Sequence, residues 1–503
     1  MKLQVALFVL FFATTATATA VVTTVGGETG TQASEGAIGH LLAAGSQAVT
    51  QSVLVVRLSD GKTLYEKNPD QLVTPASVTK VVTSAAVLTR LTPAYTFKTP
   101  FYYTGERKND RVLGDLVVVG AGDPFIVSEK LWQLAADLKN QGIREFTGDL
   151  VIDDALFDGE SRDEARIEGA KASVNAYDAP VSAFGVNFNT FAVLVAPGDR
   201  PGRPAFVSLD PYPLRGVILT NDVRTGKPHL GKALEVRRTV DVKGGEHLVA
   251  TGTIAADMPM QKIYRSVADD VQASGATLKA FLKGAGVIVR GHIHRGRLPK
   301  DATLLYTLDS YPMRKIVAGL NTYSNNYIAD MLVKRLGAAY PPKGLADAPG
   351  SGSFANGVRV LTDFLHKDVG IKSAFVLKNG SGLATENRLS ARQVVAVLAY
   401  MEKHMEAFPE FLGSLPATGW SGTLRHRFDH GAAEEMKGLF RAKTGTLTEP
   451  IAVSAIAGYF RHPKHGLVAF TILENGVEGK RQPAIADLRD QQDRVLAAFM
   501  KEI

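Results

Sequence analysis

The stretch VTPASVTKVVTSAAVL, from Val73 to Leu88, places Ser77 and Lys80 three residues apart at the start of an apolar, alanine-rich run. Residues three apart share one face of a helix, so the two side chains are expected to lie next to each other. A lysine that loses part of its hydration there has a lowered pKa and can act as a general base. The alternative is an ordinary surface lysine. Other cationic and hydrogen-bonding groups at the same spot would favour the base.

The residues around Ser77 predict that a helix begins just before it. Thr74 is a suitable N-cap, and Pro75 suits the first helical position. Near a helix start, free N–H groups and the helix dipole favour developing negative charge. The same Ser-x-x-Lys spacing recurs from Ser59 to Lys62, but that copy lies on an expected hairpin turn. Only the copy at Ser77 has the sequence context of a nucleophile.

Two further motifs supply the groups that such a nucleophile needs. The segment YSNNYIAD contributes Ser324 and Asn326 at a loop-to-helix entry, and AKTGTL puts Lys443 on a candidate strand. Lys443 offers a positive charge for a carboxylate, and the Thr444-Gly445 pair after it allows a ligand to approach the backbone closely. Each short motif alone is more often structural than functional. In this order and context, the three specify the active-serine penicilloyl-enzyme pattern.

The chain has 503 residues, which predicts two to four domains. Short strand patterns between Gly, Pro and Asp turns over 97–303 predict a β-rich inserted region of one or two domains, with an inner insert at roughly 191–252. Residues 37–96 and 304–503 then form the interrupted domain. A hairpin around Asp60-Gly61 and three C-terminal strands would make one antiparallel sheet flanked by helices. The predicted fold class is α+β.

Residues 1–20 are typical of a secretory signal peptide. Lys2 is the positive end, Leu3–Phe12 is an apolar core too short to span a bilayer, and a small-x-small cleavage motif ends at Ala20. Residues 21–36 are Thr/Gly-rich and predict a flexible leader. An N-terminal anchor helix is the weaker alternative, because threonines follow the apolar core. We expect an exported protein, periplasmic, secreted or associated with the cell wall, without a transmembrane segment in the mature chain.

The composition excludes several kinds of function. The chain has no cysteine, which excludes disulfides, thiolate nucleophiles and cysteine-based metal sites. The net charge of +7 comes from scattered Lys and Arg without a basic run between aromatics, so nucleic acid is not an expected partner. His292 and His294 form a pair, but two ligands are too few for a metal site, and solvent-facing histidines are the better interpretation. No metal or cofactor is expected.

The three motifs resemble those of the penicillin-binding protein and serine β-lactamase superfamily. The long insert between the first and second motifs is similar to that of the low-molecular-mass class C group, the D-alanyl-D-alanine carboxypeptidase/endopeptidases. Five further stretches match that group, and the similarity covers essentially the whole mature chain: Gly114–Pro124, Tyr177–Thr190, Asn379–Ser390, Leu415–Arg427 and the TILEN segment ending at Asn475. The resemblance implies a β-lactamase/transpeptidase-like domain with a helical subdomain.

The resemblance also implies catalytic roles. Ser77 is the nucleophile that becomes acylated, and Lys80 accepts its proton. Ser324 relays protons to the leaving amine, and Asn326 contacts the peptide backbone of the substrate. The backbone N–H groups of Ser77 and Thr446 form the oxyanion hole, and one such donor is worth about 10²–10³ in rate.

Substrate contacts follow from the same resemblance. Lys443 and Thr444 hold the terminal carboxylate of the substrate. Asp153 and Phe157, in VIDDALF, match the contribution of the insert to a side-chain pocket, and the alternative for Asp153 is a strand-end turn residue. Relatives that prefer a diaminopimelate side chain often carry an arginine where this sequence has Thr385.

The predicted function is therefore an exported serine-type DD-peptidase. It would remove the terminal D-alanine from peptidoglycan stem peptides, or cut D-alanine cross-links between them, through an acyl-enzyme. β-Lactam antibiotics would trap the serine as inhibitors. A serine β-lactamase or esterase on the same core is one alternative, against which the large insert argues. A non-catalytic wall-binding module is the other, against which the intact Ser77, Lys80 and Lys443 argue.

Overall fold

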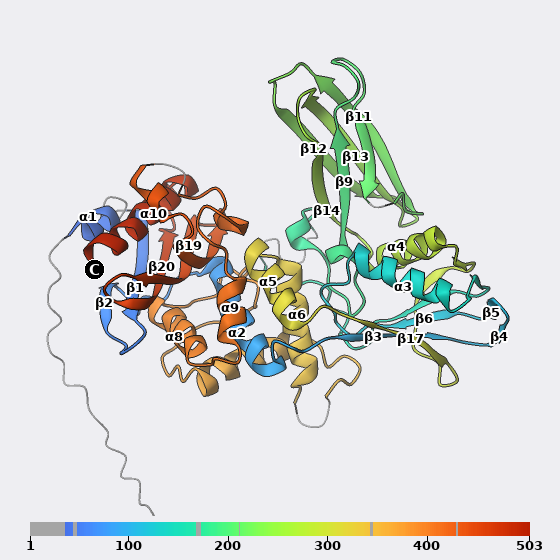
Figure 1. Cartoon of the computed structure of the whole chain (residues 1–503), viewed down its shortest axis with the longest axis horizontal. Coiled ribbons are helices and arrows are strands. Elements are labelled where there is room, and N and C mark those ends of the chain that lie inside the picture. The colour runs from blue at the N-terminus through green and yellow to red at the C-terminus, as the bar shows by residue number, and fades with distance from the viewer. Residues whose placement is uncertain (1–35, 44–47, 167–172, 211, 343–345, 429–430) are drawn as a thin grey trace, which may run out of the picture.

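The structure is a computed structural model that describes residues 36–503 except 44–47, 167–172, 211, 343–345 and 429–430. The predicted signal peptide, and the predicted leader up to residue 35, lie outside the described residues. Figure 1 shows a body of helices and sheet that carries the C-terminus, and beside it an inserted region from which a group of long strands projects.

A five-stranded antiparallel sheet forms the centre of the body. Its strand order is β18-β19-β20-β1-β2, so the first two strands of the chain lie beside the last three. The hairpin predicted around Asp60-Gly61 and the three predicted C-terminal strands are therefore confirmed. The strands are β1 (Val49–Arg57), β2 (Thr63–Lys67), β18 (Phe440–Leu447), β19 (Val453–His462) and β20 (Gly466–Gly476).

Both faces of this sheet are covered by helices. Side chains alternate between the faces of a strand, and in β1 Val53 and Val55 pack under the terminal helices α1 (Ala37–Ala43) and α10 (Ile485–Glu502). The alternate residues of β1 pack on the opposite face, in the larger core that contains α2 and α8. The sheet is thus the middle layer of the body, and the prediction of one antiparallel sheet flanked by helices is confirmed.

The helical part of the body surrounds α2, nearly all of whose residues are buried, as expected for a central helix. A π-helical turn, Phe364–Asp368, follows α7 directly. The helices are α2 (Thr79–Leu91), α5 (Met313–Tyr323), α6 (Asn326–Ala339), α7 (Phe354–Asp363), α8 (Ala391–Glu402) and α9 (Phe408–Ser414).

The start of α2 differs from the prediction. A short 3₁₀ helix, Ala76–Val78, precedes it, and α2 itself begins at Thr79. Ala76 has a φ of +46°, outside the helical region, which prevents an α-helix from running through it. The prediction that Thr74 caps the helix was wrong, because Pro75 precedes the 3₁₀ helix and no side chain caps it.

The inserted region leaves and rejoins the body on neighbouring strands. β3 (Lys98–Tyr103) pairs antiparallel with β17 (Thr303–Asp309) at the edge of a mixed sheet of order β16-β8-β6-β3-β17. A smaller sheet has the order β15-β7-β5-β4. The remaining strands of these two sheets are β4 (Glu106–Lys108), β5 (Arg111–Leu113), β6 (Leu116–Val119), β7 (Glu145–Phe146), β8 (Leu150–Asp153), β15 (Ile288–Val289) and β16 (Ile293–Arg295).

Two helices, α3 (Ser128–Asn140) and α4 (Asp270–Ala285), pack on these strands. Leu134 of α3 and Leu278 of α4 share a buried core with Ile152 of β8. The description of this region as β-rich left out both helices. The pattern of α3 was readable, since its buried residues recur with helical spacing.

The six remaining strands form the projecting lobe at the top of Figure 1. They make two three-stranded sheets around a separate core, with the orders β10-β9-β14 and β11-β13-β12. The predicted domain boundaries stay a prediction. The strands are β9 (Thr190–Ala196), β10 (Phe206–Asp210), β11 (Val217–Gly226), β12 (Lys232–Val240), β13 (Glu246–Ala255) and β14 (Gln261–Ser266).

Candidate active site

Three segments that are far apart in the chain meet at the N-terminal end of α2. Ser77 lies in the 3₁₀ helix and Lys80 in the first turn of α2. Ser324 is the left-handed residue between α5 and α6, with a φ of +54°, and Asn326 begins α6. Lys443 lies in the middle of β18, an outer strand of the main sheet. The three predicted motifs therefore form one site.

Lys80 is the centre of this site. Its Nζ donates hydrogen bonds to Ser77 Oγ at 2.9 Å, to Asn326 Oδ1 at 2.7 Å and to the carbonyl oxygen of Ser381. The side chain is fully buried, and burial lowers its pKa to about 7, against the opposing effect of the negative charge of Asp330. A substantial fraction of Lys80 is therefore unprotonated near neutral pH, next to the hydroxyl of Ser77.

Lys443 is a second fully buried lysine beside the first. Its Nζ donates to Ser324 Oγ at 2.7 Å and to the carbonyl oxygen of Thr444 at 2.6 Å. Burial, together with the positive charge of Lys80, holds the pKa of Lys443 well below its usual value. No carboxylate of the described residues forms an ion pair with Lys443, so a bound carboxylate would supply the missing counter-charge.

Two glycines allow other segments to close on the backbone of Ser77. A Cβ on Gly445 would lie 2.7 Å from the carbonyl oxygen of Pro75 and 3.0 Å from the nitrogen of Ser77. A Cβ on Gly382, whose φ is +81°, would lie 2.0 Å from the carbonyl oxygen of Ala76. The close approach predicted at Gly445 is thus made by the chain itself, and it leaves no room for a side chain there.

The segment before Ser77 is held by Asn475, from β20. Asn475 Oδ1 accepts a hydrogen bond from the backbone nitrogen of Thr74 at 2.7 Å, and its Nδ2 donates to the carbonyl oxygen of Thr74 at 2.9 Å. Arg388 donates to the hydroxyl of Thr74 at 2.7 Å. Because the amide group of Asn475 and the backbone of Thr74 are buried, these bonds fix where the nucleophile segment meets the sheet.

A cavity of about 500 Å³ opens over Ser77 and Ser324. Thr444, Gly445 and Thr446 form its β18 wall. Basic side chains also line it, and Arg489 from α10 donates to Thr446 Oγ1 at 3.1 Å. Its basic lining suits a ligand that carries a carboxylate. The remaining polar and charged lining residues are Thr423, His426, Arg427 and Ser454.

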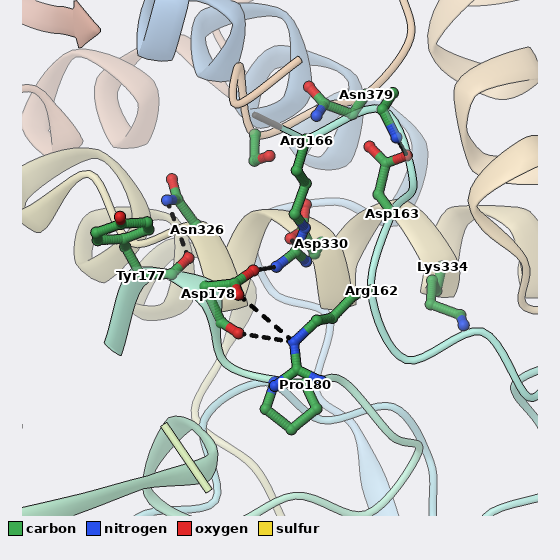
Figure 2. A network of polar contacts seen from close by, with 12 residues as sticks. Arg162, Asp163, Arg166, Tyr177, Asp178, Pro180, Asn326, Asp330, Lys334 and Asn379 are labelled. Atoms are coloured by element: carbon green, nitrogen blue, oxygen red, sulfur yellow. Dashed lines mark hydrogen bonds and ion pairs between the residues drawn. The ribbon is translucent and has the colours of Figure 1, made fainter. Parts of the chain in front are cut away.

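A second cavity, of about 650 Å³, shares Ser324 with the first and is also lined by Asn326. Its walls come mostly from α5, α6 and the inserted region, and they are rich in aromatic side chains. Asn326 Nδ2 donates to the carbonyl oxygen of Tyr177 at 3.2 Å, so the insert contacts the site directly (Figure 2). The aromatic lining residues are Phe125, Tyr177, Phe188, Tyr264, Tyr311, Tyr323 and Tyr327.

Asp153 and Phe157 are not brought to this site. They line a separate cavity of about 430 Å³ that shares no lining residue with the two others. Asp153 accepts hydrogen bonds from the backbone nitrogens of Leu298 at 2.8 Å and Ala155 at 3.2 Å, as a strand-end turn residue does. Their predicted part in substrate binding stays a prediction.

Sequence reasoning missed three residues around Lys80. Asp330 follows Asn326 by four positions on α6, and this spacing was the readable signal, since it puts both on one helix face. Ser381, which accepts from Lys80, and Arg166, which pairs with Asp330, come from other segments and carried no such signal.

No group of three or more His, Cys, Asp or Glu side chains within the described residues is arranged to hold a metal ion. His294, one of the two histidines considered as ligands, instead lies 3.4 Å from the carboxylate of Asp149. In the part of the chain that the structure describes, no helix has both the length and the apolar character needed to cross a bilayer.

Comparisons with known proteins cover most of the chain. The model of the D-Ala-D-Ala carboxypeptidase 3 (S13) family matches residues 36–498. The D-alanyl-D-alanine carboxypeptidase of Actinomadura sp. (strain R39) is 31% identical over 458 residues, which span 88% of this chain and 80% of that protein. The carboxypeptidase DacB of Haemophilus influenzae is 24% identical over 423 residues, 83% of this chain and 84% of that one.

Solved structures show the same fold. The crystal structure of penicillin-binding protein 4 from Haemophilus influenzae superposes with a TM-score of 0.73 at 23% identity, covering 92% of this chain and 99% of that one. It has also been solved in complex with a β-lactam. Bd3459, a predatory peptidoglycan endopeptidase from Bdellovibrio bacteriovorus, superposes with a TM-score of 0.54 at 16% identity, covering 90% and 93%. The predicted penicillin-binding fold is confirmed.

Proposed function

The chain belongs to the D-Ala-D-Ala carboxypeptidase 3 (S13) family, and on that premise we propose that it is a serine-type DD-peptidase of peptidoglycan with Ser77 as its nucleophile. The observation that carries the proposal is the 2.9 Å hydrogen bond between Lys80 and Ser77. Lys80 is fully buried, and none of the described carboxylates forms an ion pair with it, so burial favours loss of its proton.

The reaction begins with attack of Ser77 Oγ on the carbonyl carbon between two D-alanines, while the Ser77 proton passes to unprotonated Lys80. The backbone N–H groups of Ser77 and Thr446 stabilise the oxyanion. When the C–N bond breaks, its electron pair leaves with the amine of the terminal D-alanine, which receives a proton through Ser324. The product of this half is an ester between Ser77 and the shortened stem peptide.

Binding orients the substrate for that attack. Lys443 and Thr444 hold the terminal carboxylate, which gives buried Lys443 the counter-charge that the described protein residues lack. Asn326 contacts the peptide backbone of the substrate. Water then adds to the ester carbonyl while its proton passes to Lys80. The bond between the acyl carbon and Ser77 Oγ breaks, Oγ takes the proton back from Lys80, and the shortened stem leaves with a free carboxylate.

The leaving amine decides which activity results. If it belongs to a terminal D-alanine, the enzyme is a carboxypeptidase; if it belongs to a second stem peptide, the same steps cut a cross-link. The aromatic cavity of about 650 Å³ beside Ser324 and Asn326 provides room for the rest of a stem peptide. β-Lactams acylate Ser77 in place of the dipeptide. The protein acts outside the cytoplasm, in the periplasm or at the cell wall.

The domain division follows the motifs. Residues 37–96 and 304–503 form the penicillin-binding part and hold all three motifs, and 97–303 is the inserted region. The inner insert at about 191–252 belongs to the projecting lobe. Since Tyr177 and Arg166 of the inserted region contact residues of α6 at the site, the insert takes part in shaping it.

A muropeptide assay tests this function. The mature protein is incubated with a monomeric pentapeptide muropeptide and with a cross-linked dimer, and the products are separated by chromatography and identified by mass. Released D-alanine or cleaved dimer, both absent with Ser77→Ala, is the expected result. No product from either substrate would overturn the proposal, and fast turnover of a chromogenic cephalosporin in its place would assign a β-lactamase.

A further inference from the structure

Arg166 connects the inserted region to the interior of the penicillin-binding part. Its guanidinium lies between two buried carboxylates: Nη2 is 2.8 Å from Asp330 Oδ2 on α6, and Nη1 contacts Asp178 of the insert. The three side chains are only 1%, 2% and 1% exposed, respectively. Figure 2 shows Arg166 reaching down from the insert between the two carboxylates. A guanidinium this deeply buried needs both partners, because an unpaired buried charge costs several kcal/mol.

Asp330 is in turn the negative charge that acts on Lys80. It follows Asn326 by one helical turn, and Asn326 Oδ1 accepts a hydrogen bond from Lys80. Burial raises the pKa of Asp330 to about 6, while the charges of Arg166 and Lys80 oppose that shift. Among the described residues, Arg166 is the only ion-pair partner of Asp330. The negative charge of Asp330 is therefore compensated by Arg166, by a proton kept on Lys80, or in acid by protonation of Asp330 itself.

We propose that Arg166 is a positioning residue for the reaction: by pairing with Asp330, it removes the negative charge that would otherwise hold a proton on Lys80, and so keeps Lys80 ready to accept the proton of Ser77. This rests on the proposed function in one respect, the role of Lys80 as the base. Arg166 belongs to the inserted region, 97–303. The insert therefore takes part in catalysis through the charge of this arginine.

Other charged groups face this cluster and remain in the variants below. Lys443 lies near Lys80, and the positive charge of Lys80, after burial, lowers the pKa of Lys443. Asp163 faces both Arg166 and Asp330. Lys334, one turn beyond Asp330 on α6, has its own partner, Asp158, at 2.5 Å. Their charges are constant between variants to a first approximation, so differences in pH dependence report on Arg166 and Asp330.

The experiment measures the rate of acylation by a fluorescent penicillin against pH. The rate requires unprotonated Lys80, so it falls below the pKa of Lys80, and raising that pKa by about 1 lowers the rate on the acid limb about tenfold. Arg166→Gln leaves the negative charge of Asp330 without its ion-pair partner. Its acid limb is expected to move to higher pH, with a several-fold lower rate at pH 6 and an unchanged plateau at high pH. Asp330→Asn is expected to move the limb to lower pH.

Two further variants separate electrostatics from structure. The double variant Arg166→Gln, Asp330→Asn removes both charges, and its acid limb is expected to return close to that of the wild type. Arg166→Lys keeps the charge and is expected to keep the limb. Arg162→Gln is the matched control, because Arg162 lies 3.7 Å from Asp178 but forms no ion pair with Asp330; its acid limb should stay in place.

Unchanged acid limbs in both Arg166→Gln and Asp330→Asn, or a fall in rate by the same factor at every pH, would overturn the inference and leave a structural role only. If Arg166→Gln does not fold, as judged by circular dichroism and thermal unfolding, the shift of Asp330→Asn to lower pH and its reversal in the double variant still decide. A wild type that shows no acylation, or no acid limb, would instead contradict the proposed function.

Discussion

The ammonium group of Lys443 donates a hydrogen bond of 2.7 Å to the hydroxyl of Ser324, although 119 positions separate the two residues in the chain. Lys443 is fully buried, and burial and Lys80 together lower its pKa. A buried cation without a carboxylate partner is unfavourable in the free enzyme and becomes favourable when an anion binds. The site is therefore prepared for a substrate that ends in a carboxylate.

Removing that cation should weaken the recognition of the carboxylate. Lys443→Met is expected to lower kcat/KM for a D-alanyl-D-alanine peptide by about 10–100-fold, the size of one charge-assisted hydrogen bond. Steady-state kinetics with peptides that end in a free or an amidated carboxyl group will measure it, and only the wild type should distinguish the two. Lys464→Met, on the exposed turn between β19 and β20, is the control. Equal discrimination by wild type and Lys443→Met would contradict the assignment.

Loss of the nucleophile should abolish covalent labelling. Ser77→Ala removes the oxygen that Lys80 contacts but little packing, so we expect no label from fluorescent penicillin and an almost unchanged melting temperature. Labelling is read on a denaturing gel, and folding by thermal unfolding. Ser59→Ala, in the second Ser-x-x-Lys copy, should label normally. A persistent label in Ser77→Ala would point to another nucleophile.

The base should give the acylation rate a defined pH dependence. The unprotonated amine of Lys80 takes the proton, so the rate is expected to be low in acid, to rise through a midpoint of about 7, and to level off above it. Lys80→Met should lower the rate by about 10²–10⁴ and remove this limb. Stopped-flow or quenched labelling from pH 5 to 9 measures both effects. Lys62→Met is the control with the same motif spacing, and near-normal acylation by Lys80→Met would refute the assignment.

The two hydrogen bonds between Asn475 and the backbone of Thr74 should support both the stability of the fold and the rate of acylation. Asn475→Ala leaves the buried N–H and C=O groups of Thr74 without partners, at a cost of about 1–3 kcal/mol for each group. Urea unfolding should show the lower stability, and labelling at fixed pH should be slower, because the segment before Ser77 is less firmly held. Asn475→Asp keeps the acceptor for the Thr74 N–H but puts a second oxygen against the carbonyl oxygen of Thr74, so it should also lose stability. If Asn475→Ala were as stable as the wild type, the hydrogen bonds of Asn475 to Thr74 would not be needed for stability.

Glu474 should make stability depend on pH. Burial raises its pKa to about 7, although Gln51 and Gln492 donate hydrogen bonds to it at 2.9 and 3.0 Å. The folded state thus binds this proton more tightly than the unfolded state does, where the pKa is about 4.5. Its stabilising contribution is complete below that value and is lost as the pH rises through 7.

Glu474→Gln keeps the size of the side chain and removes the titration. The variant should therefore lose less stability than the wild type between pH 5 and pH 8, measured as the midpoint of urea unfolding. Asp123, whose pKa burial also raises to about 7, titrates equally in both proteins, so the difference between them isolates Glu474. Identical pH dependence in wild type and Glu474→Gln would contradict the shifted pKa.

Local patterns were sufficient for much of the fold and for the choice of motif residues. The hairpin at Asp60-Gly61 and the strands of the main sheet follow from turn chemistry and from short apolar runs, which depend on only a few residues. The pairing of Ser77 with Lys80 also depends on a spacing of three positions. The helix start at Thr74 was misjudged, because contacts with β18 and Gly382 hold Ala76 in a left-handed conformation that local propensity does not reveal.

The chemical state of the site came from contacts between distant segments. The sequence alone gives Lys80 the pKa of an ordinary lysine. In the folded chain, Asn326, which lies 246 positions away, and the carbonyl group of Ser381 surround its amine and exclude water. The ion pair of Arg166 with Asp330 and the hydrogen bonds of Asn475 to Thr74 also join segments that are distant in the chain. Desolvation and charge act through space, so proton affinities follow from which segments the fold packs together, and no pattern along the chain records that.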